Sequence, residues 1–555
     1  MQYLISRDSI CSQFIKVTLI LKCENREKVS LQLAAWRPGR YELANYAQKI
    51  RGFQVLFQEK PVKWNKTTKD LWYFEAEKPG SYEISYSFYC NQMDAGGCWS
   101  DDTQLYLNFS NFIFEILEKK NQEISIQIDL PKDYQIATAL PNKGNNHWKA
   151  KNYQHLMDSP LLASDQLSKY TYEVNGSDFF LWFNGEIFFD VNRLIQDFKR
   201  FTTAQIKAFG DFPSEEYHFI FQLLPYRHYH GVEHAHSTVI TFGPASRLLN
   251  KPDLDELMGV SSHELYHFWN VCRIRPKALT TYDLSKETYL ESGLVLEGVT
   301  TYMGDLFLLK SGYFSIEDYL KILEKQIQRE LDHFGWQNQS IVESSYDLWL
   351  DGYKTGIPDK KVNIYNRGAL ISLCLDLMLL DEGSSLSIVM KKMWEKFGMT
   401  GIGYSLSDFK EIVYQEFKNN SAIDAFFHRI VFGHEDLYPY LKILLNTIGV
   451  TIEEKVKEDV LLHDFGIRTH EDGIIQQIHP ESKAYYTLML GDKVLKINGA
   501  DFDKNKLGSV ENAAFFINRF ERLIYCNIPP EPGKFYPKFE LALEKYNEKT
   551  SKWMK

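Results

Sequence analysis

The chain has 555 residues, of which 44% are hydrophobic and 25% are charged, a composition typical of a soluble globular protein with three or four domains. Its net charge is −10 at pH 7 without long runs of one sign, which argues against nucleic acid and anionic membrane surfaces as partners. The seven cysteines include no CxxC pair, so neither a cysteine zinc site nor a disulfide framework is indicated.

Residues 1–165 contain short segments rich in β-branched and aromatic residues, among them FIKVTLILKC (14–23) and SYEISYSFYC (81–90). Clusters of Gly, Pro, Asn or Lys bound each segment, as turns bound strands. The pattern predicts an N-terminal antiparallel β domain, shaped as a sandwich or a saddle.

The pattern is mixed between residues 166 and 245, where the strands YHFIFQLLPY and STVITFG flank the loop RHYHGVEHAH. From about residue 250 to 446 the apolar residues recur at helical spacing, and Gly312 is the predicted stop of one helix. The remaining residues return to strand patterns with one short helical piece. The sequence therefore predicts a multidomain α+β protein with domains at 1–165, 166–446 and 447–555.

Targeting and membrane-spanning segments are not apparent in the sequence. The N-terminus lacks the basic flank, continuous apolar core and cleavage site of a signal peptide. No stretch reaches the roughly 18 uninterrupted apolar residues that a transmembrane helix needs. We therefore expect a cytoplasmic protein without a membrane partner.

The segment SSHELYHFWNVCRIRP (261–276) carries an HExxH motif within a predicted helix. His263 and His267 are four residues apart, so both rings lie on one face and can bind a single ion. Glu264 is turned by about 100° around the helix axis, which suits a general base that acts on water without being a ligand. Because an HExxH match arises by chance in roughly a few per cent of chains this long, packed histidines remain the alternative.

A catalytic zinc site needs a third protein ligand and an open fourth position. The following helical segment, YLESGLVLEGVTTYMGDL, offers two carboxylates, Glu291 and Glu297. Spacing alone does not choose between them, and surface ion pairing is the alternative for either. The HExxH helix and the glutamate-bearing helix together indicate zinc.

Five segments resemble, in order, those of the glycyl aminopeptidase family, which are zinc metallopeptidases of the gluzincin type. WRPGRYELANYAQKI is similar to the family's WxPGSYxIRDFARxI, HGVEHAHS to GGLEHxxS, and HELYHFWNVCRIRP to HExxHxWNVKRIRP. LVLEGVTTYMGDL resembles EGFTxYYxxL, and IYNRGALISLCLDLML resembles YxKGALVxxxLDLxL. Finally, GDKVLKING is similar to the GDxILxING end of a PDZ domain, which these enzymes carry at the C-terminus.

The resemblance implies a role for each matching residue. It implies a thermolysin-like, mainly helical catalytic domain that binds one Zn²⁺ per chain, with Glu297 as third ligand beside His263 and His267. Glu264 would be the general base, Tyr365 would donate a hydrogen bond to the oxyanion, and Glu233 would bind the free α-amine of a peptide. Small N-terminal residues such as Gly or Ala are the implied substrates. The departures from the family pattern are at Ala44, Asn45, Cys272 and Val299.

Two other hypotheses about the function stay open. In a zinc endopeptidase Glu233 would merely pack, and a blocked N-terminus would be tolerated. In a peptide-binding protein without peptidase activity, the PDZ-like domain would bind peptide ends by strand addition, with Phe465-Gly466 of LHDFGIRT as its carboxylate loop. That match is partial, so a purely structural PDZ-like domain is a further alternative.

Several charged residues near the motifs have no assigned role. Arg273 and Arg275 follow the zinc helix and either hold a substrate carboxylate or pair structurally. His230, His234 and His236 could suggest a second metal, but the resemblance gives them no such role, and loop histidines are usually solvated or packed. We expect no second metal there.

Overall fold

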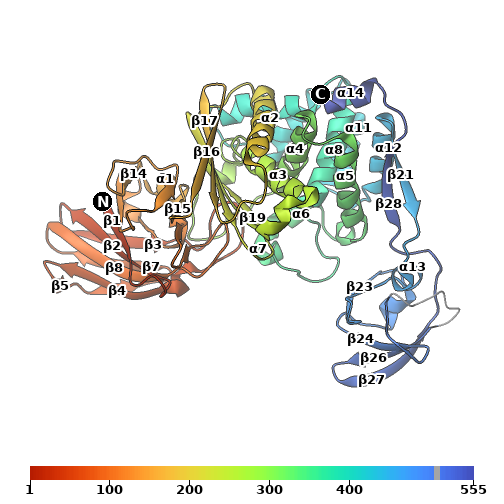
Figure 1. Cartoon of the computed structure of the whole chain (residues 1–555), viewed down its shortest axis with the longest axis horizontal. Helices are drawn as coiled ribbons and strands as arrows, with labels where there is room; N and C mark the ends of the chain where they lie inside the picture. The colour runs from red at the N-terminus through yellow and green to blue at the C-terminus, as the bar shows by residue number, and fades with distance from the viewer. Residues whose placement is uncertain (505–512) are drawn as a thin grey trace.

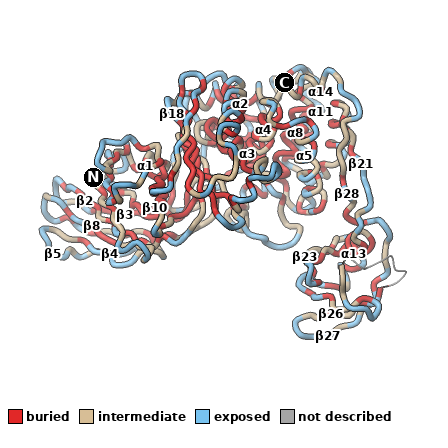
Figure 2. Tube along the Cα trace, in the orientation of Figure 1, coloured by how far each residue is buried: buried red, intermediate tan, exposed pale blue. Residues whose placement is uncertain are grey.

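The computed structural model describes residues 1–504 and 513–555. Figure 1 shows three regions: the N-terminal sheets at one end, a mainly helical region in the middle, and a smaller β region below the far end. The first two regions share one apolar core, whereas a second core lies between Val460 and Ile528 (Figure 2). Among the described residues, no helix is long and apolar enough to cross a membrane.

The N-terminal region contains three sheets, ordered β14-β12-β1-β2-β8-β4-β5, β11-β3-β7-β6 and β13-β15-β10-β9. The long strands β2 and β8 pair in register along their whole length, and most alternate residues of β2 are buried, as in a strand with one face on the core. The bounds are β1 Gln2–Arg7, β2 Phe14–Cys23, β3 Glu27–Leu33, β4 Ile50–Phe57, β5 Lys60–Pro61, β6 Trp64–Lys66, β7 Leu71–Ala76, β8 Gly80–Tyr89, β9 Trp99–Ser100, β10 Gln104–Leu107, β11 Phe114–Ile116, β12 Ile124–Ile128, β13 Gln135–Ala137, β14 His147–Ala150 and β15 Leu161–Ser164, with the helix α1 Tyr153–Met157.

The prediction of an N-terminal β-sheet domain is confirmed, but its sheets are not wholly antiparallel. Strands β1 and β12 pair in parallel, which requires a long connection, and the strands β2 to β11 form that connection. The strand-like sequence 104–117 is divided in the structure, because a 3₁₀ turn at Phe109–Asn111 separates β10 from β11. The pattern within a strand does not reveal which distant strand pairs with it.

The central region begins with a five-stranded sheet ordered β16-β17-β18-β20-β19. β17, β18 and β20 are parallel, whereas β19 is antiparallel to β20 and forms the edge. One face of the sheet packs on the N-terminal region through an apolar cluster that includes Tyr106 and Val239. The strand bounds are β16 Ser168–Val174, β17 Ser177–Asn184, β18 Glu216–Leu223, β19 His228–Glu233 and β20 Ser237–Gly243. The segment RHYHGVEHAH, predicted as a loop, therefore contains the whole of the edge strand β19.

Helices cover the other face of this sheet (Figure 1). Their apolar residues recur at helical spacing, as the sequence predicts, and the helix that ends at Lys310 is followed by Gly312 in a left-handed conformation (φ +75°). The bounds are α2 Val191–Phe209, α3 Lys251–Tyr266, α4 Thr300–Lys310, α5 Ile316–Leu331, α6 Ile341–Tyr346, α7 Leu348–Asp351, α8 Asn366–Asp381, α9 Leu386–Met393, α10 Leu406–Tyr414, α11 Ser421–Phe426 and α12 Tyr438–Thr447.

The C-terminal region holds a four-stranded sheet, β25-β24-β26-β27, a hairpin β22-β23 and a pair β21-β28. The final helix returns to the central region, where the indole nitrogen of Trp553 donates to Tyr302 Oη at 2.9 Å. The bounds are β21 Val450–Lys455, α13 Val460–Phe465, β22 Ile467–Thr469, β23 Ile475–Ile478, β24 Lys493–Ile497, β25 Ala500–Asp501, β26 Ala513–Arg519, β27 Arg522–Ile528, β28 Lys538–Leu543 and α14 Glu548–Met554. The likeness of this C-terminal region to a PDZ domain and the bounds of the three domains stay predictions.

Candidate active site

The two histidines of the HExxH motif lie at the C-terminal end of α3. Their Nε2 atoms are 3.0 Å apart, because residues four apart on a helix stack on one face. The Nδ1 atom of His267 is 2.8 Å from the backbone oxygen of Asn270. A proton on Nδ1 satisfies that oxygen and leaves Nε2 with a free lone pair, the form in which histidine binds metals.

Glu297 brings a carboxylate to the same point. Its Oε2 is 3.7 Å from Nε2 of His263 and 3.5 Å from Nε2 of His267. Glu297 lies in a π-helical turn, Leu294–Val299, that leads into α4, and such turns are frequent at functional sites. Glu291, the alternative that spacing leaves open, is exposed on the preceding segment.

Glycines allow the elements around Glu297 to approach closely. A Cβ on Gly304 would be 3.0 Å from the Cα of His263, so the absence of a side chain lets α4 cross α3 at the first histidine. Gly298 and Gly368 lie backbone to backbone, and a Cβ on either would be 2.5 or 2.6 Å from the other. That second contact brings the start of α8, where Tyr365 lies, next to the Glu297 turn.

Glu264 and Glu233 lie close to the same metal-ligand group, next to His267. One ligand atom from each, together with one from His267, lies within a 4.8 Å cluster. Glu233 is the last residue of the edge strand β19, and Gly231 two residues earlier lies against the Glu264 carboxylate. The edge strand therefore places one carboxylate itself and confines the other.

In this cluster several buried carboxyl groups lie around one histidine, and their charges shift one another's pKa values. Burial raises the pKa of Glu264 to about 8, and the charges of Glu233 and Glu297 raise it while His267 lowers it. For Glu297, burial also opposes ionisation, but its interactions with His263 and His267 hold its pKa at about 2. A bound divalent cation would lower the pKa of the neighbouring carboxyl groups.

The donor set fits a divalent metal such as zinc. His, His and Glu are three ligands that catalytic zinc sites use, and their ligand atoms lie within 4.8 Å of one another. Oε2 of Glu297 and Oε2 of Glu264 are buried and have no hydrogen-bond partner among the residues that the structure describes. Buried polar atoms are normally paired, so these oxygens fit a site whose remaining partner is a metal ion with its water.

Tyr365 lies at the start of α8, directly before its first residue. Burial raises the pKa of its hydroxyl well above the usual value, and the charge of Glu297 and the neighbouring Tyr353 add to this rise. The hydroxyl therefore stays protonated and able to donate at neutral pH. Tyr353 comes from the segment after α7, and its own hydroxyl accepts a hydrogen bond from the backbone N–H of Tyr41 at 3.3 Å.

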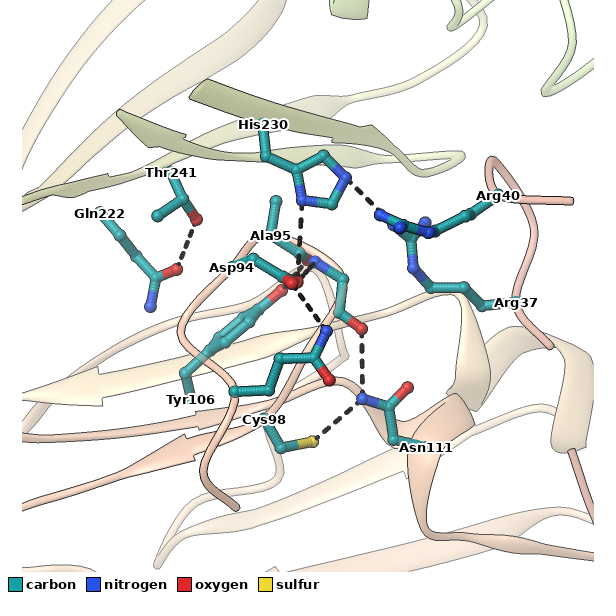
Figure 3. A network of polar contacts seen from close by, with 12 residues as sticks. Arg37, Arg40, Asp94, Ala95, Cys98, Tyr106, Asn111, Gln222, His230 and Thr241 are labelled. Carbon is teal, nitrogen blue, oxygen red and sulfur yellow. Dashed lines mark hydrogen bonds and ion pairs between the residues drawn. The ribbon is translucent and has the colours of Figure 1, made fainter. Parts of the chain in front are cut away.

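The N-terminal region contributes a loop to this cleft. A Cβ on Gly39, which has a left-handed φ of +77°, would be 2.6 Å from Oε2 of Glu233. Nη2 of the buried Arg37 donates to Nε2 of His230 on β19 at 3.2 Å, and Nδ1 of His230 is 3.7 Å from Asp94 Oδ1. Figure 3 shows His230 pointing from the central sheet toward Arg37 and Asp94. These contacts fix the edge strand against the N-terminal sheets.

Arg273 and Arg275, which follow α3, both have structural partners. Arg273 donates to the backbone oxygens of Phe268 and Ala235 and lies over the Phe268 ring. Arg275 donates to the backbone oxygen of Cys272. Each forms local contacts that hold the turn after α3.

The three histidines around β19 have separate partners. His230 contacts Arg37 and Asp94, as described above. Nδ1 of His234 is 3.1 Å from Asp158 Oδ1, and Nδ1 of His236 is 2.9 Å from Ser214 Oγ.

Three residues at the site, Arg37, Asn270 and Tyr353, have no predicted role in the sequence. Asn270 donates to the backbone oxygen of Val295 and to Thr300 Oγ1, at 2.7 and 2.9 Å, and so connects the histidine turn to the Glu297 turn. Arg37 and Asn270 lie within the quoted segments WRPGRYELANYAQKI and HELYHFWNVCRIRP. Tyr353 lies outside all five segments, so no signal in the sequence points to it.

Two solved structures share the fold. The crystal structure of an aminopeptidase N family protein from Idiomarina loihiensis aligns over 100% of both chains, with a TM-score of 0.91 and 23% identity. The M1 zinc metallopeptidase from Deinococcus radiodurans aligns over 78% of this chain and 93% of its own, with a TM-score of 0.50 and 14% identity. At these identities the likeness establishes the multidomain fold, with its N-terminal β-sheet domain and helical region.

Family comparison adds to this likeness in fold. No curated protein matches the sequence. The family model described as "Peptidase M61 N-terminal domain" matches residues 2–165, and the model described as "M61 glycyl aminopeptidase" matches residues 256–371, which contain the HExxH motif, Glu297 and Tyr365. The chain belongs to the M61 glycyl aminopeptidase family, a family of metallopeptidases.

Proposed function

We propose that the protein is a zinc-dependent aminopeptidase that removes small N-terminal residues, such as glycine or alanine, from peptides. The observation that carries this proposal is the convergence of His263, His267 and Glu297 on one point, with Glu264 and Glu233 facing the same group. A three-ligand metal site beside a free carboxylate supports a hydrolytic reaction. A further carboxylate at a fixed position supports recognition of an amine.

The proposed roles follow from the chemistry of each group. Zinc held by the two histidines and Glu297 supplies a Lewis acid that polarises the scissile carbonyl and lowers the pKa of water. Glu264 accepts the proton of the attacking water and passes it to the leaving amine. The hydroxyl of Tyr365 donates a hydrogen bond to the carbonyl oxygen as negative charge develops there, which stabilises the transition state more than the substrate.

The preference for a free N-terminus is assigned to Glu233. Its carboxylate pairs with the α-ammonium group at one distance from the scissile bond, which places the first peptide bond for attack. No strand of the described residues pairs with the outer edge of β19, so this edge can pair with the substrate backbone. Gly39 lies directly against the Glu233 carboxylate, so the N-terminal loop closes the cleft behind the amine and supports the removal of single residues.

The test compares an alanine-containing peptide with a free and with an acetylated N-terminus, on protein whose zinc content is measured. Chelator-sensitive release of alanine from the free peptide alone is the expected result. The Glu264→Gln variant should keep its zinc and lose at least 100-fold in kcat, because it removes the base and no ligand. The Glu233→Gln variant should lose the preference for the free amine, whereas the matched change at exposed Glu291 should leave it intact.

Two results would contradict the proposal in different ways. Equal cleavage of both peptides would identify an endopeptidase and contradict the proposed role of Glu233 in binding the α-amine. Cleavage of neither peptide by protein with one zinc per chain would contradict peptidase activity and favour a peptide-binding function.

A further inference from the structure

A large cavity extends from the catalytic cleft to the C-terminal region. Its volume is about 1080 Å³, and it runs from Tyr365 and Tyr353 past the C-terminal end of α5 to Tyr485, Met489 and Leu490. We call it the interdomain groove. Pockets for small ligands typically measure about 300–1,000 Å³, so this groove offers more room than one amino acid needs.

The C-terminal wall of the groove is held at a defined position by contacts with the end of α5. Nη2 of Arg468 forms an ion pair with Asp332 Oδ2 at 2.6 Å, and Nε2 of Gln477 donates to the Asp332 backbone oxygen at 2.6 Å. The rings of Phe334 and His479 lie 4.5 Å apart in an edge-to-face arrangement. Because Asp332 is buried, these contacts form a preorganised wall.

That wall presents apolar side chains to the groove. Tyr485, Met489 and Leu490 line it and are 52%, 51% and 42% exposed. Between them Leu488 is buried in the C-terminal core and anchors the segment. Large exposed apolar side chains that gather in a concave surface mark binding sites.

The opposite wall presents an unpaired cation. Lys360 and Lys361 also line the groove, but both pair with Asp351. Arg329, on the last turn of α5, is exposed to the groove and forms no ion pair with any residue that the structure describes. An exposed guanidinium in a concave site suits a carboxylate, which it can bind through two parallel hydrogen bonds.

Arg329 also lies within electrostatic reach of Tyr229 on β19. Burial raises the pKa of the Tyr229 hydroxyl on β19; the charge of Glu264 adds to that rise, and the charge of Arg329 opposes it. The groove meets the candidate active site at Tyr365, which lines it.

We propose that the interdomain groove binds the part of a short peptide that follows the scissile bond, with its free C-terminal carboxylate on Arg329 and its side chains on Tyr485, Met489 and Leu490. This inference rests on the proposed aminopeptidase function, since it requires the N-terminus of the same peptide at Glu233. The C-terminal region then acts as a wall of the active site. The preferred substrates are short peptides with both ends free.

The test uses the full-length zinc-loaded protein and three substrates: Ala-Ala-Ala, its C-terminal amide, and alanine 4-nitroanilide, which has neither an amino acid residue beyond the scissile bond nor a C-terminal carboxylate. In the wild type, kcat/KM should be higher for the acid than for the amide. The Arg329→Gln variant should lower this acid-to-amide ratio about tenfold. The Tyr485→Ala variant should raise KM for both tripeptides, whereas Tyr486→Ala, at a neighbour that is 85% exposed and does not line the groove, should not.

The outcomes separate this inference from the proposed function. The nitroanilide could be cleaved while the acid-to-amide ratio of kcat/KM is the same in the wild type and in Arg329→Gln. This result would overturn the proposed role of the groove and leave the proposed aminopeptidase function intact. If nothing is cleaved, calorimetric binding of the acid and the amide to Glu264→Gln protein, with and without Arg329→Gln, gives a second readout. A selective loss of acid binding would support the groove even then, and equal binding of both would overturn it.

Discussion

Gly231 on the edge strand β19 lies against the carboxylate of Glu264 on α3. A Cβ built at Gly231 would overlap Oε1 of Glu264, would be 2.8 Å from its Cδ, and would be 3.0 Å from Cγ2 of Val260. The strand that is proposed to hold the substrate thus also sets the position of the proposed general base. No other residue type fits at position 231 without displacing that carboxylate.

The first prediction concerns the Gly231→Ala variant. Its methyl group should push the Glu264 carboxylate away from the metal site, and a displacement near 1 Å costs about 100-fold in rate. We expect kcat/KM to fall by about that factor while the zinc content stays at the wild-type level, because no ligand moves. Steady-state kinetics and metal analysis on the same sample check this.

Gly259 on α3 provides the control for this variant. A Cβ at Gly259 would be 3.6 Å from Asp305 Oδ1, an ordinary contact. Gly259→Ala should therefore keep activity and stabilise α3 by about 0.5–1 kcal/mol, since alanine favours a helix over glycine. Equal activity in both variants would show that Gly231 does not confine Glu264.

Local patterns predicted the helices of the site but not its edge strand β19, which lies in a segment predicted as a loop. Strand-like segments became β2 and β8, the HExxH segment became the end of α3, and the helical segment after it placed Glu297 beside both histidines. These residues are close in sequence or fixed by a motif with its own geometry. The choice between Glu291 and Glu297 needed the family resemblance, because both lie in the same segment.

Contacts between distant segments do not follow from local patterns. Arg37 and Tyr353 reach the cleft from loops that are far from α3 in the chain, and no periodicity marks them. The parallel pairing of β1 with β12 and the edge position of β19 depend on which strands become neighbours. Strand register across more than a hundred residues is set by tertiary packing, which the pattern within one segment does not encode.

A second prediction tests Asn270 as a positioning residue for the metal ligands. Its backbone oxygen orients His267, and its side chain holds the Glu297 turn. Asn270→Ala should lower zinc affinity by about 10- to 100-fold, as losses of such supporting contacts do. Competition with a chelator of known affinity measures this. Asn250→Ala, at an exposed position before α3, should leave zinc affinity unchanged, and an equal affinity in both variants would contradict the role of Asn270.

A third prediction concerns the pH dependence of stability. Burial raises the pKa of Asp305 to about 7, above its usual value of 3.8, although a hydrogen bond from Gln326 opposes the rise. Between those pH values the folded protein binds more protons than the unfolded chain, so the free energy of unfolding falls as pH rises from about 4 to 7. In the Asp305→Asn variant this fall in the free energy of unfolding should not occur, because asparagine does not ionise.

The two proteins should therefore have similar stability at pH 4 and differ at pH 8. At pH 8 the variant should be more stable by about 1–2 kcal/mol, less than the full shift implies because the carboxyl group is partly exposed. Chemical denaturation at both pH values gives the difference. A difference of the same size at pH 4 and pH 8 would mean that titration of Asp305 is not its cause.

The last prediction tests whether the N-terminal loop closes the cleft behind Glu233. Gly39→Ala places a methyl group 2.6 Å from Oε2 of Glu233 and should displace the carboxylate proposed to bind the α-amine. Gly52 has a similar left-handed φ, +67° against +77°, but a Cβ at Gly52 would have no atom within 4 Å. Both alanine variants carry the same backbone cost of roughly 1 kcal/mol, so their difference isolates the contact with Glu233. We expect KM for a free-amine peptide to rise about tenfold in Gly39→Ala only. Equal KM values in the two variants would mean that the N-terminal loop has no role in substrate binding.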